Sequence, residues 1–570
     1  MYFHLHHRRL RYNNIRQYAP EIVLFSFVFI LIFFRLGIGE IQSWDESLYL
    51  IRAKACLEFD AWFDQTKYAV GGLYSSTHPP LVIWLMAIVR SVFGEGNIAV
   101  RLVSASSAVV SILFFFLLSK RVFSRYAALF GSALLGCAQG FVYYSHRAQL
   151  DIPMFACILV SAYYAVRANE SANYKFAVIS GIFFAGALLA KAFQGLYFLP
   201  FIFSLPFLYS SHKKIKLISV IVGSAVVIAA PWYIYMILKY PSFYADYLNL
   251  VAAMKSGTYS KEGLTAWWYY MNQIIIDFPL LVGAIIAIPY FFVKQKNGSV
   301  KRRLSIFSVL WFVVFLVFIS VFNSRMSHFV LFLFLPASLT LTALLDEFLS
   351  STKNTRFILL FITASLIAII WSSSELLRIG VRTGVWDLLD VKELLVNPLL
   401  YIGVVILTVP FIVDSFLDVR AKIVYSCCSL LILGAFMRLE SRRDSAYIDG
   451  ASAVTRILLN SSEIYSIEVY HNDYPHEAFL PQFNYYSNGW LLGWDPRRIG
   501  QTRTWQEIDT MLNRGIRPAS DAAIVYTSWD SFYERTEGEK KLLERINTNL
   551  AACFRRSLHT KKYQLYWQRK

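Results

Sequence analysis

Residues 22 to 46 read IVLFSFVFILIFFRLGIGEIQSWDE, an apolar run that ends at Ile38 and is soon followed by the adjacent carboxylates Asp45 and Glu46. Hydrophobic residues make up 56% of the chain, charged residues only 16%, and the mean hydropathy is +0.47. Ionisable groups beside a bilayer are costly, so these two carboxylates are candidates for function. The simpler alternative is that they only stabilise the first turn of a following helix.

Apolar runs of this kind recur through the first 437 residues. Many approach the roughly 20 residues that cross a hydrocarbon core of ~30 Å, so they predict one all-α polytopic membrane domain over 22–437, with about thirteen transmembrane helices. The expected spans are 22–38, 102–118, 126–144, 152–166, 176–190, 195–209, 217–237, 276–293, 304–322, 329–345, 357–371, 398–413 and 423–437. The run 81–93 is shorter and follows Pro79-Pro80, so it predicts an interfacial or re-entrant helix.

Basic residues gather in every second connection between these spans. The set comprises Arg8, Arg9, Arg11, Lys120, Arg121, Arg125, Lys213, Lys214, Lys216, Lys294, Lys296, Lys301, Arg302, Arg303, Lys353, Arg356, Arg420 and Lys422. The positive-inside rule then predicts a cytoplasmic N-terminus over 1–21, a long external loop over 39–101 and an external C-terminus. This pattern explains the net charge of +18 without a nucleic-acid partner. The expected location is the inner, or plasma, membrane of a bacterium.

The composition becomes ordinary after residue 437, which predicts a separate extracytoplasmic domain over 438–570. Residues 446–459 are typical of a helix, 464–470 and 522–526 of strands, and Thr504 with Glu507 forms a capping-box pattern. We therefore expect an α+β domain. Four of the six cysteines lie in apolar spans, so the sequence indicates no disulfide framework and no metal site.

With this topology, polar residues at the ends of several spans face the same side of the membrane. The acidic candidates are Asp45, Glu46 and Asp151, and the basic ones are Lys191, Arg101, His78, Arg147, Arg325 and His328. A carboxylate can take a proton from an acceptor, and cations can stabilise a departing phosphate. The pattern therefore suits a reaction between a lipid-borne phosphorylated donor and an acceptor. The alternatives are that Arg101 and Lys191 anchor helix ends by snorkelling and that His328 is an interface histidine.

Six stretches in order carry a resemblance to a known family. They are WDESLY at 44–49, THPPL at 77–81, VRLVSA at 100–105, RAQLDIP at 147–153, LAKA at 189–192 and APWY at 230–233. Together they resemble the integral-membrane glycosyltransferases of the GT-C fold. The chain is most similar to the bacterial branch that includes the lipid A aminoarabinose transferases, and more distantly to the protein O-mannosyltransferases. The resemblance extends over roughly residues 20–340.

The resemblance implies transfer of a sugar, with inversion, from a polyprenyl-phosphate carrier to a lipid, glycan or protein acceptor. It matches Asp45 to the acid of the family's Asp-Glu pair, as the base or the carboxylate that orients the acceptor, and Lys191 to a lysine that faces the carrier phosphate. The sequence implies no cofactor; it leaves room for a divalent cation without requiring one. Three positions differ from the aminoarabinose transferases: Leu48 replaces an arginine, Phe329 replaces a tyrosine, and residues 251–259 lack a histidine. His78 also stands where that branch has lysine.

Two other functions remain open at this point. A transporter or flippase for lipid-linked glycans would use the same basic residues to bind a pyrophosphate but would need no carboxylate base. A receptor-like scaffold would place its function in the external domain. The predicted spans are almost free of charge in their interiors, which disfavours a transporter. The ordered motifs disfavour the scaffold. The sequence identifies neither the sugar nor the acceptor.

Overall fold

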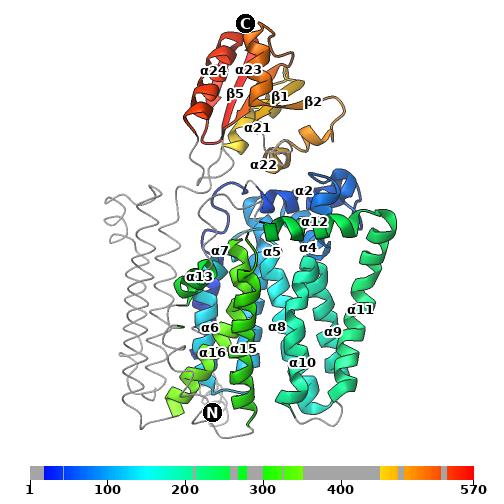
Figure 1. Cartoon of the computed structure of the whole chain (residues 1–570), viewed down its shortest axis with the longest axis vertical. Coiled ribbons are helices and arrows are strands. Elements are labelled where there is room, and N and C mark those ends of the chain that lie inside the picture. The colour runs from blue at the N-terminus through cyan, green and yellow to red at the C-terminus, as the bar shows by residue number, and fades with distance from the viewer. Residues whose placement is uncertain are drawn as a thin grey trace, which may run out of the picture. The chain divides into compact units, whose positions relative to one another are not determined.

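The computed structural model describes residues 18, 20–22, 24–42, 44–209, 214–256, 268–278, 281, 299–323, 326–350, 450–472, 480–527 and 536–569. The chain divides into two compact units (Figure 1). Unit 1 comprises 1–36, 103–239 and 247–442, and unit 2 comprises 37–102, 240–246 and 443–570. Each unit is described by itself.

Unit 1 is helical throughout its described residues. Its helices are α6 (Arg125–Cys137), α7 (Gln139–Ser145), α8 (Asp151–Ser171), α9 (Tyr174–Lys191), η2 (Ala192–Phe198), α10 (Leu199–Leu208), α11 (Lys214–Lys239), α13 (Tyr269–Asp277), α15 (Val300–Ser320), η3 (Ser327–Val330) and α16 (Leu331–Ser350), together with most of α5 (Asn97–Ser119) and α12 (Phe243–Ser256). Helix α8 packs against α9, α9 against α11, and α16 against both α6 and α15 (Figure 1).

Six helical stretches among the described residues are long and apolar enough to cross a membrane. They are Asn97–Ser119, Asp151–Ser171, Tyr174–Leu208, Ile215–Lys239, Val300–Ser320 and Ser327–Glu347. These stretches agree with the spans expected over the same residues and make the protein a polytopic membrane protein. Most of 276–293, and all of 357–371, 398–413 and 423–437, lie outside the described residues. The shorter apolar helix Pro20–Phe33 overlaps the first expected span, 22–38, and ends before it.

The 35-residue stretch Tyr174–Leu208 folds back on itself after α9. A Cβ atom built on Gly195 would lie 2.9 Å from the carbonyl carbon of Ala187. Eight residues of continuous helix would separate these positions by about 12 Å. The reversal begins at Ala192, whose φ of 49° is left-handed, and α10 then packs against α8 and α15. Helix α9 covers the predicted span 176–190, whereas η2 and the 10-residue helix α10 lie over the predicted span 195–209.

The expected span 126–144 is not one straight helix. Helices α6 and α7 meet at Ala138 with a bend of 61°. Ala138 is extended there, and the Gly140 amide at the start of α7 donates a 2.6 Å hydrogen bond to the buried carboxylate of Asp277 in α13. Because the break leaves backbone amides of α7 without helical partners, a side chain from another helix satisfies one of them.

Unit 2 joins the polar segment after the first apolar run to the C-terminal domain. Its N-terminal part holds α2 (Asp45–Glu58), η1 (Thr66–Tyr68), α3 (Leu73–Ser76) and α4 (Leu81–Phe93). Helix α4 matches the short apolar run predicted not to cross the membrane, and it is 13 residues long. Leu85, Ile88 and Val92 are exposed along one side of it at helical spacing, whereas Arg90 is buried.

The C-terminal domain contains a five-stranded mixed sheet in the order β2-β1-β3-β5-β4. Its elements are α21 (Ala451–Asn460), β1 (Ser466–His471), α22 (Pro481–Tyr486), η5 (Trp490–Leu492), β2 (Ile499–Thr504), α23 (Trp505–Asn513), β3 (Ala522–Tyr526), α24 (Glu537–Cys553), β4 (Phe554–His559) and β5 (Tyr563–Arg569). Strands β1, β2 and β3 are parallel, and β5 runs antiparallel to β3 and β4. The predicted strand 522–526 is β3, and the predicted capping box at Thr504 begins α23 with both of its hydrogen bonds present.

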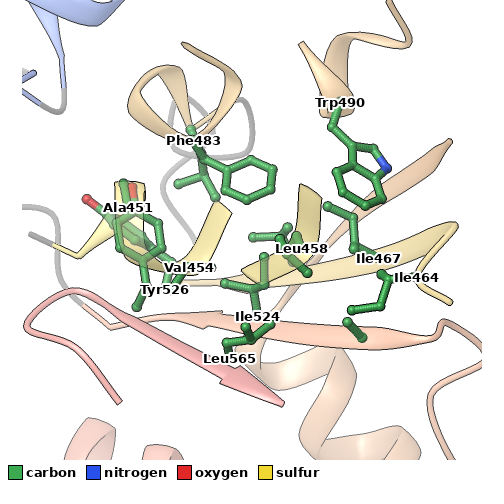
Figure 2. Packing of buried hydrophobic residues seen from close by; sticks show 14 residues of the cluster. Ala451, Val454, Leu458, Ile464, Ile467, Phe483, Trp490, Ile524, Tyr526 and Leu565 are labelled. Atoms are coloured by element: carbon green, nitrogen blue, oxygen red, sulfur yellow. The ribbon is translucent and has the colours of Figure 1, made fainter. Parts of the chain in front are cut away.

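Both faces of this sheet are covered by helices. On one face Val454 and Leu458 of α21 and Phe483 of α22 pack on alternate strand residues such as Ile467 and Ile524 (Figure 2). On the other face α23 and α24 pack on Tyr470, Ala523, Val525 and Tyr566. The alternation of side chains along each strand therefore builds two separate hydrophobic layers from one sheet.

Candidate functional site

Helix α2 begins at the carboxylate pair that the sequence singles out. The N-cap residue Trp44 has φ −136° and ψ −102°, and its own side chain makes no capping hydrogen bond with the described residues. Asp45 and Glu46 occupy the first turn, where negative charge interacts favourably with the helix dipole. Asp45 is half-buried and Glu46 is fully buried. The capping alternative accounts for their position on the helix but not for the contacts of Glu46.

Glu46 forms a buried, two-pronged ion pair with Arg101. The Arg101 Nε and Nη2 atoms lie 2.9 and 3.2 Å from the two carboxylate oxygens, and both side chains are at most 3% exposed. The same guanidinium donates to the carbonyl oxygens of Ile38 and Glu40 at 2.9 and 2.8 Å. Arg101 therefore ties α5 to both the start of α2 and the segment before it. Its predicted contact with a donor phosphate stays a prediction.

We expect Arg101→Ala to lower the free energy of unfolding by about 3–5 kcal/mol, because it leaves the Glu46 carboxylate buried without its counter-charge. Arg101→Lys should recover only part of this loss, since an ammonium cannot reproduce the planar fork. Thermal unfolding of the purified protein in detergent measures both effects. The control is Arg121→Ala, which breaks the more exposed pair with Glu170 and should cost about 0–1 kcal/mol. Equal losses for Arg101→Ala and Arg121→Ala would contradict the assignment.

Arg52 connects α2 to the segment that carries His78. It follows Asp45 by seven residues, so the two lie on the same face of the helix two turns apart. Its guanidinium donates to the carbonyl oxygens of Ser75 and His78 and to Gln65 Oε1, each at 2.9 Å. Burial lowers its pKa to about 10, against the opposing influence of Cys56, Tyr49 and Asp64. The half-buried His78 ring also packs edge-on against Tyr49 at 5.7 Å.

Sequence reasoning missed Arg52 because an arginine in a polar segment carries no distinctive signal. Its seven-residue spacing from Asp45 could have indicated a shared helix face. Its hydrogen bonds to Gln65 and to the segment that holds Ser75 and His78 became visible only in the folded structure.

In unit 1, Asp151 and Lys191 form a second buried ion pair. Asp151 is the first residue of α8 and Lys191 the last of α9, so the two helices bring them to the same end of an antiparallel pair. Lys191 Nζ lies 2.6 Å from Asp151 Oδ1, and both side chains are at most 6% exposed. Lys191 is therefore a buried ion-pair partner, not a snorkelling anchor.

Two further predicted site residues of unit 1 are described: Arg147 lies between α7 and α8, and His328 lies in η3. The buried Arg147 places its guanidinium 4.0 Å from the centre of the Tyr143 ring. His328, half-buried in η3, interacts electrostatically with both Lys191 and Asp151. The neighbouring Ser327 hydroxyl hydrogen-bonds that of Tyr144 at 2.7 Å. The structure thus groups Asp151, Lys191 and His328. Arg325 lies outside the described residues.

The candidate site offers carboxylates and cations, two of each joined in ion pairs. Over the described part of the chain, no group of three or more His, Cys, Asp or Glu side chains could hold a metal ion. A half-buried carboxylate at a helix start can accept a proton, and a buried lysine can stabilise an anion if it can exchange its carboxylate partner for that anion.

Comparison with known proteins gives matches in sequence and in fold. Residues 77–235 match the family model described as dolichyl-phosphate-mannose-protein mannosyltransferase. The undecaprenyl phosphate-alpha-4-amino-4-deoxy-L-arabinose arabinosyl transferase of Pseudomonas savastanoi pv. phaseolicola is 26% identical over 50% of this chain and 54% of the relative. The protein of the same description from Shewanella sediminis is 22% identical over 56% of this chain and 58% of its own length. The chain thus spans about half the length of the curated relatives it matches.

The fold comparison extends over nearly the whole chain. The crystal structure of ArnT from Cupriavidus metallidurans bound to undecaprenyl phosphate aligns with a TM-score of 0.64 at 14% identity, covering 96% of this chain and 98% of that one. Its apo state gives a TM-score of 0.60 with the same coverage. The predicted fold is therefore confirmed in its coarse form: the chain has an ArnT-like GT-C fold, and its sequence resembles the aminoarabinose transferases and the protein mannosyltransferases.

Proposed function

We propose that this protein is a membrane glycosyltransferase that moves a sugar from a polyprenyl-phosphate-linked donor to a lipid, glycan or protein acceptor on the extracytoplasmic face. The observation that carries the proposal is where the charged residues of the ordered motifs lie. Asp45 starts α2, Asp151 starts α8 and Lys191 ends α9. The similarity to arabinosyl transferases and the ArnT-like fold support the same reaction class.

The proposed chemistry divides the roles among these groups. The acceptor's nucleophilic atom attacks the anomeric carbon with inversion while the bond from that carbon to the phosphate oxygen breaks. The Asp45 carboxylate takes the acceptor proton, and the phosphate leaves with the bonding electron pair on its polyprenyl carrier. Cations stabilise the charge on this leaving group. For that role we propose Lys191 first, with His78, Arg147, His328, Arg325 and Arg101 as further candidates. Asp151 is a second candidate carboxylate.

The finer architecture is also a proposal. We propose thirteen spans within 22–437, a cytoplasmic N-terminus over 1–21 and a periplasmic domain over 438–570, in the inner membrane of a bacterium. The alternation of basic loops along the sequence supports this orientation. Six helical stretches among the described residues are long and apolar enough to cross a membrane, which supports a polytopic domain.

A transport assay and a transfer assay distinguish this function from the flippase alternative. Proteoliposomes containing the purified protein would be given synthetic undecaprenyl-phosphate sugars and candidate acceptors. The proposal expects release of sugar-free undecaprenyl phosphate that depends on the acceptor. Movement of a fluorescent lipid-linked glycan between leaflets without release of the carrier would support a flippase instead. Mass spectrometry of envelope glycans from cells with and without the protein then identifies the acceptor.

We expect an exposed cysteine in the C-terminal domain, Arg514→Cys, to react with a membrane-impermeant maleimide on intact spheroplasts. Lys120→Cys, in a basic connection, should react only after permeabilisation. Cys553, Cys427 and Cys428 would first be replaced by serine, and Cys56 needs no replacement because it is buried and burial raises its pKa to about 11. Labelling of Lys120→Cys alone on intact spheroplasts would overturn the proposed orientation.

A further inference from the structure

A short irregular segment, residues 38–42, precedes helix α2. It is held mainly by hydrogen bonds to side chains of other segments. Such a segment has no helix or sheet partners for its backbone, so each polar group needs another partner. The Arg101 guanidinium donates to the carbonyl oxygens of Ile38 and Glu40, and the Asn97 side-chain amide donates to the carbonyl oxygen of Gly39 at 2.6 Å. The Gln42 amide donates to Glu46 at 2.8 Å. These contacts hold one side of the segment against α2 and α5.

The C-terminal domain supplies the remaining contacts from more than 400 residues away in sequence. The Ile41 amide donates to the Tyr486 hydroxyl at 2.8 Å, and Gln482 Nε2 donates to the Ile41 carbonyl oxygen at 2.7 Å. Both residues belong to α22. Gln482 is itself held through Oε1, which accepts a 3.2 Å hydrogen bond from the Tyr563 hydroxyl of β5. The buried Ile41 is therefore bonded through both of its backbone groups to the domain.

Glu40 makes a second connection to the same domain. Its carboxylate accepts hydrogen bonds from the backbone amides of Gly450 and Ser452 at 2.8 and 3.1 Å, and from the Ser452 hydroxyl. These amides open α21, where orphan N–H groups and the helix dipole favour a carboxylate. Glu40 thus caps a helix of the C-terminal domain while its own carbonyl oxygen accepts from Arg101.

We infer that the C-terminal domain positions the carboxylate of Asp45 by clamping residues 38–42. The clamp holds the backbone that leads into α2, and the Arg101–Glu46 pair holds the first turn of the helix, so together they set where α2 begins. Tyr486 and Gln482 are positioning residues that act through Ile41. This inference rests on the proposed function, because it assigns the clamp a role in the same transfer reaction.

The test combines hydrogen exchange with kinetics on the full-length protein. Tyr486→Phe keeps the ring and removes only the acceptor of the Ile41 amide, and adding Gln482→Met removes the second bond. We expect amide exchange in peptides covering 38–50 to quicken roughly tenfold. We expect kcat for transfer to fall roughly ten- to a hundredfold while KM for the donor changes little, because small displacements of a reacting group cost rate before binding.

Tyr485→Phe is the matched control. It makes the same change in the same helix, at a tyrosine whose hydroxyl has no hydrogen bond among the described residues. It should leave both exchange and kcat unchanged. Unaltered exchange in the Tyr486 variants would overturn the clamp. If the Tyr486 variants showed faster amide exchange but a normal kcat, while Asp45→Asn was inactive, the positioning role would be overturned. A third outcome is that the wild-type protein shows no transfer activity although amide exchange is faster in the variants. This would refute the proposed reaction, and with it the positioning of a catalytic group. It would still confirm the clamp as a structural contact.

Discussion

Asp45→Asn is expected to lower the rate of sugar transfer by at least ~10²-fold while leaving expression and membrane insertion unchanged and lowering the free energy of unfolding by only about 0.3–1 kcal/mol, the usual contribution of one charge in the first turn of a helix. General-base assistance typically contributes 10²- to 10⁴-fold, and an amide of the same shape cannot take the acceptor proton. The side chain is half-buried at the first residue of α2, and the neighbouring Glu46 carries the ion pair with Arg101. The substitution therefore removes a proton acceptor without breaking that buried pair.

The controls separate loss of the base from loss of structure. Asp60→Asn makes the same change at an exposed residue just after α2, where φ is 53° and asparagine is tolerated. It should transfer sugar at the normal rate. Asp45→Glu keeps a carboxylate on a longer side chain and should retain more activity than Asp45→Asn. Near-normal turnover by Asp45→Asn would remove Asp45 from the proposed mechanism.

The parts of the fold that depend on local pattern could be predicted from the sequence. The strand 522–526 lies at the predicted residues because its apolar run is bounded by turn-forming residues, and Thr504 begins α23 through a local capping box. A second capping box, Thr536 with Glu539, begins α24 and could have been found in the same way. The bend at Ala138 could not, because the carboxylate that satisfies the Gly140 amide beside it comes from Asp277, which is distant in sequence.

The candidate site shows the same division between local and distant information. Sequence position singled out Asp45, Glu46, Asp151, Arg101 and Lys191 as charged residues at the ends of apolar runs. It could not say which charges would meet. Glu46 and Arg101 are 55 residues apart, Asp151 and Lys191 are 40 residues apart, and each pairing depends on how separate helices pack. Arg101 and Lys191, both predicted to face a phosphate, are thus paired with carboxylates in the folded protein.

This pairing makes Lys191→Gln the second substitution with a large expected effect. If Lys191 binds the donor phosphate, removing it deletes a charge-assisted hydrogen bond worth about 1.5–3 kcal/mol. That corresponds to a roughly 10- to 150-fold loss of affinity for the carrier phosphate. The substitution also leaves Asp151 buried without its partner, which costs about 3–5 kcal/mol of stability. A loss of activity in the single variant would therefore have two explanations.

The double variant Asp151→Asn/Lys191→Gln separates these two explanations. It removes both charges, so no buried ion is left without a partner. We expect it to recover most of the thermal stability of the wild type but to bind sugar-free undecaprenyl phosphate as weakly as Lys191→Gln. Asp151→Asn alone should bind the carrier at least as tightly as the wild type, since its lysine has no competing carboxylate. Direct titration of undecaprenyl phosphate into each detergent-solubilised variant measures this affinity without relying on turnover. If the double variant recovered carrier affinity together with stability, Lys191 would be a structural partner of Asp151 and not a ligand of the donor phosphate.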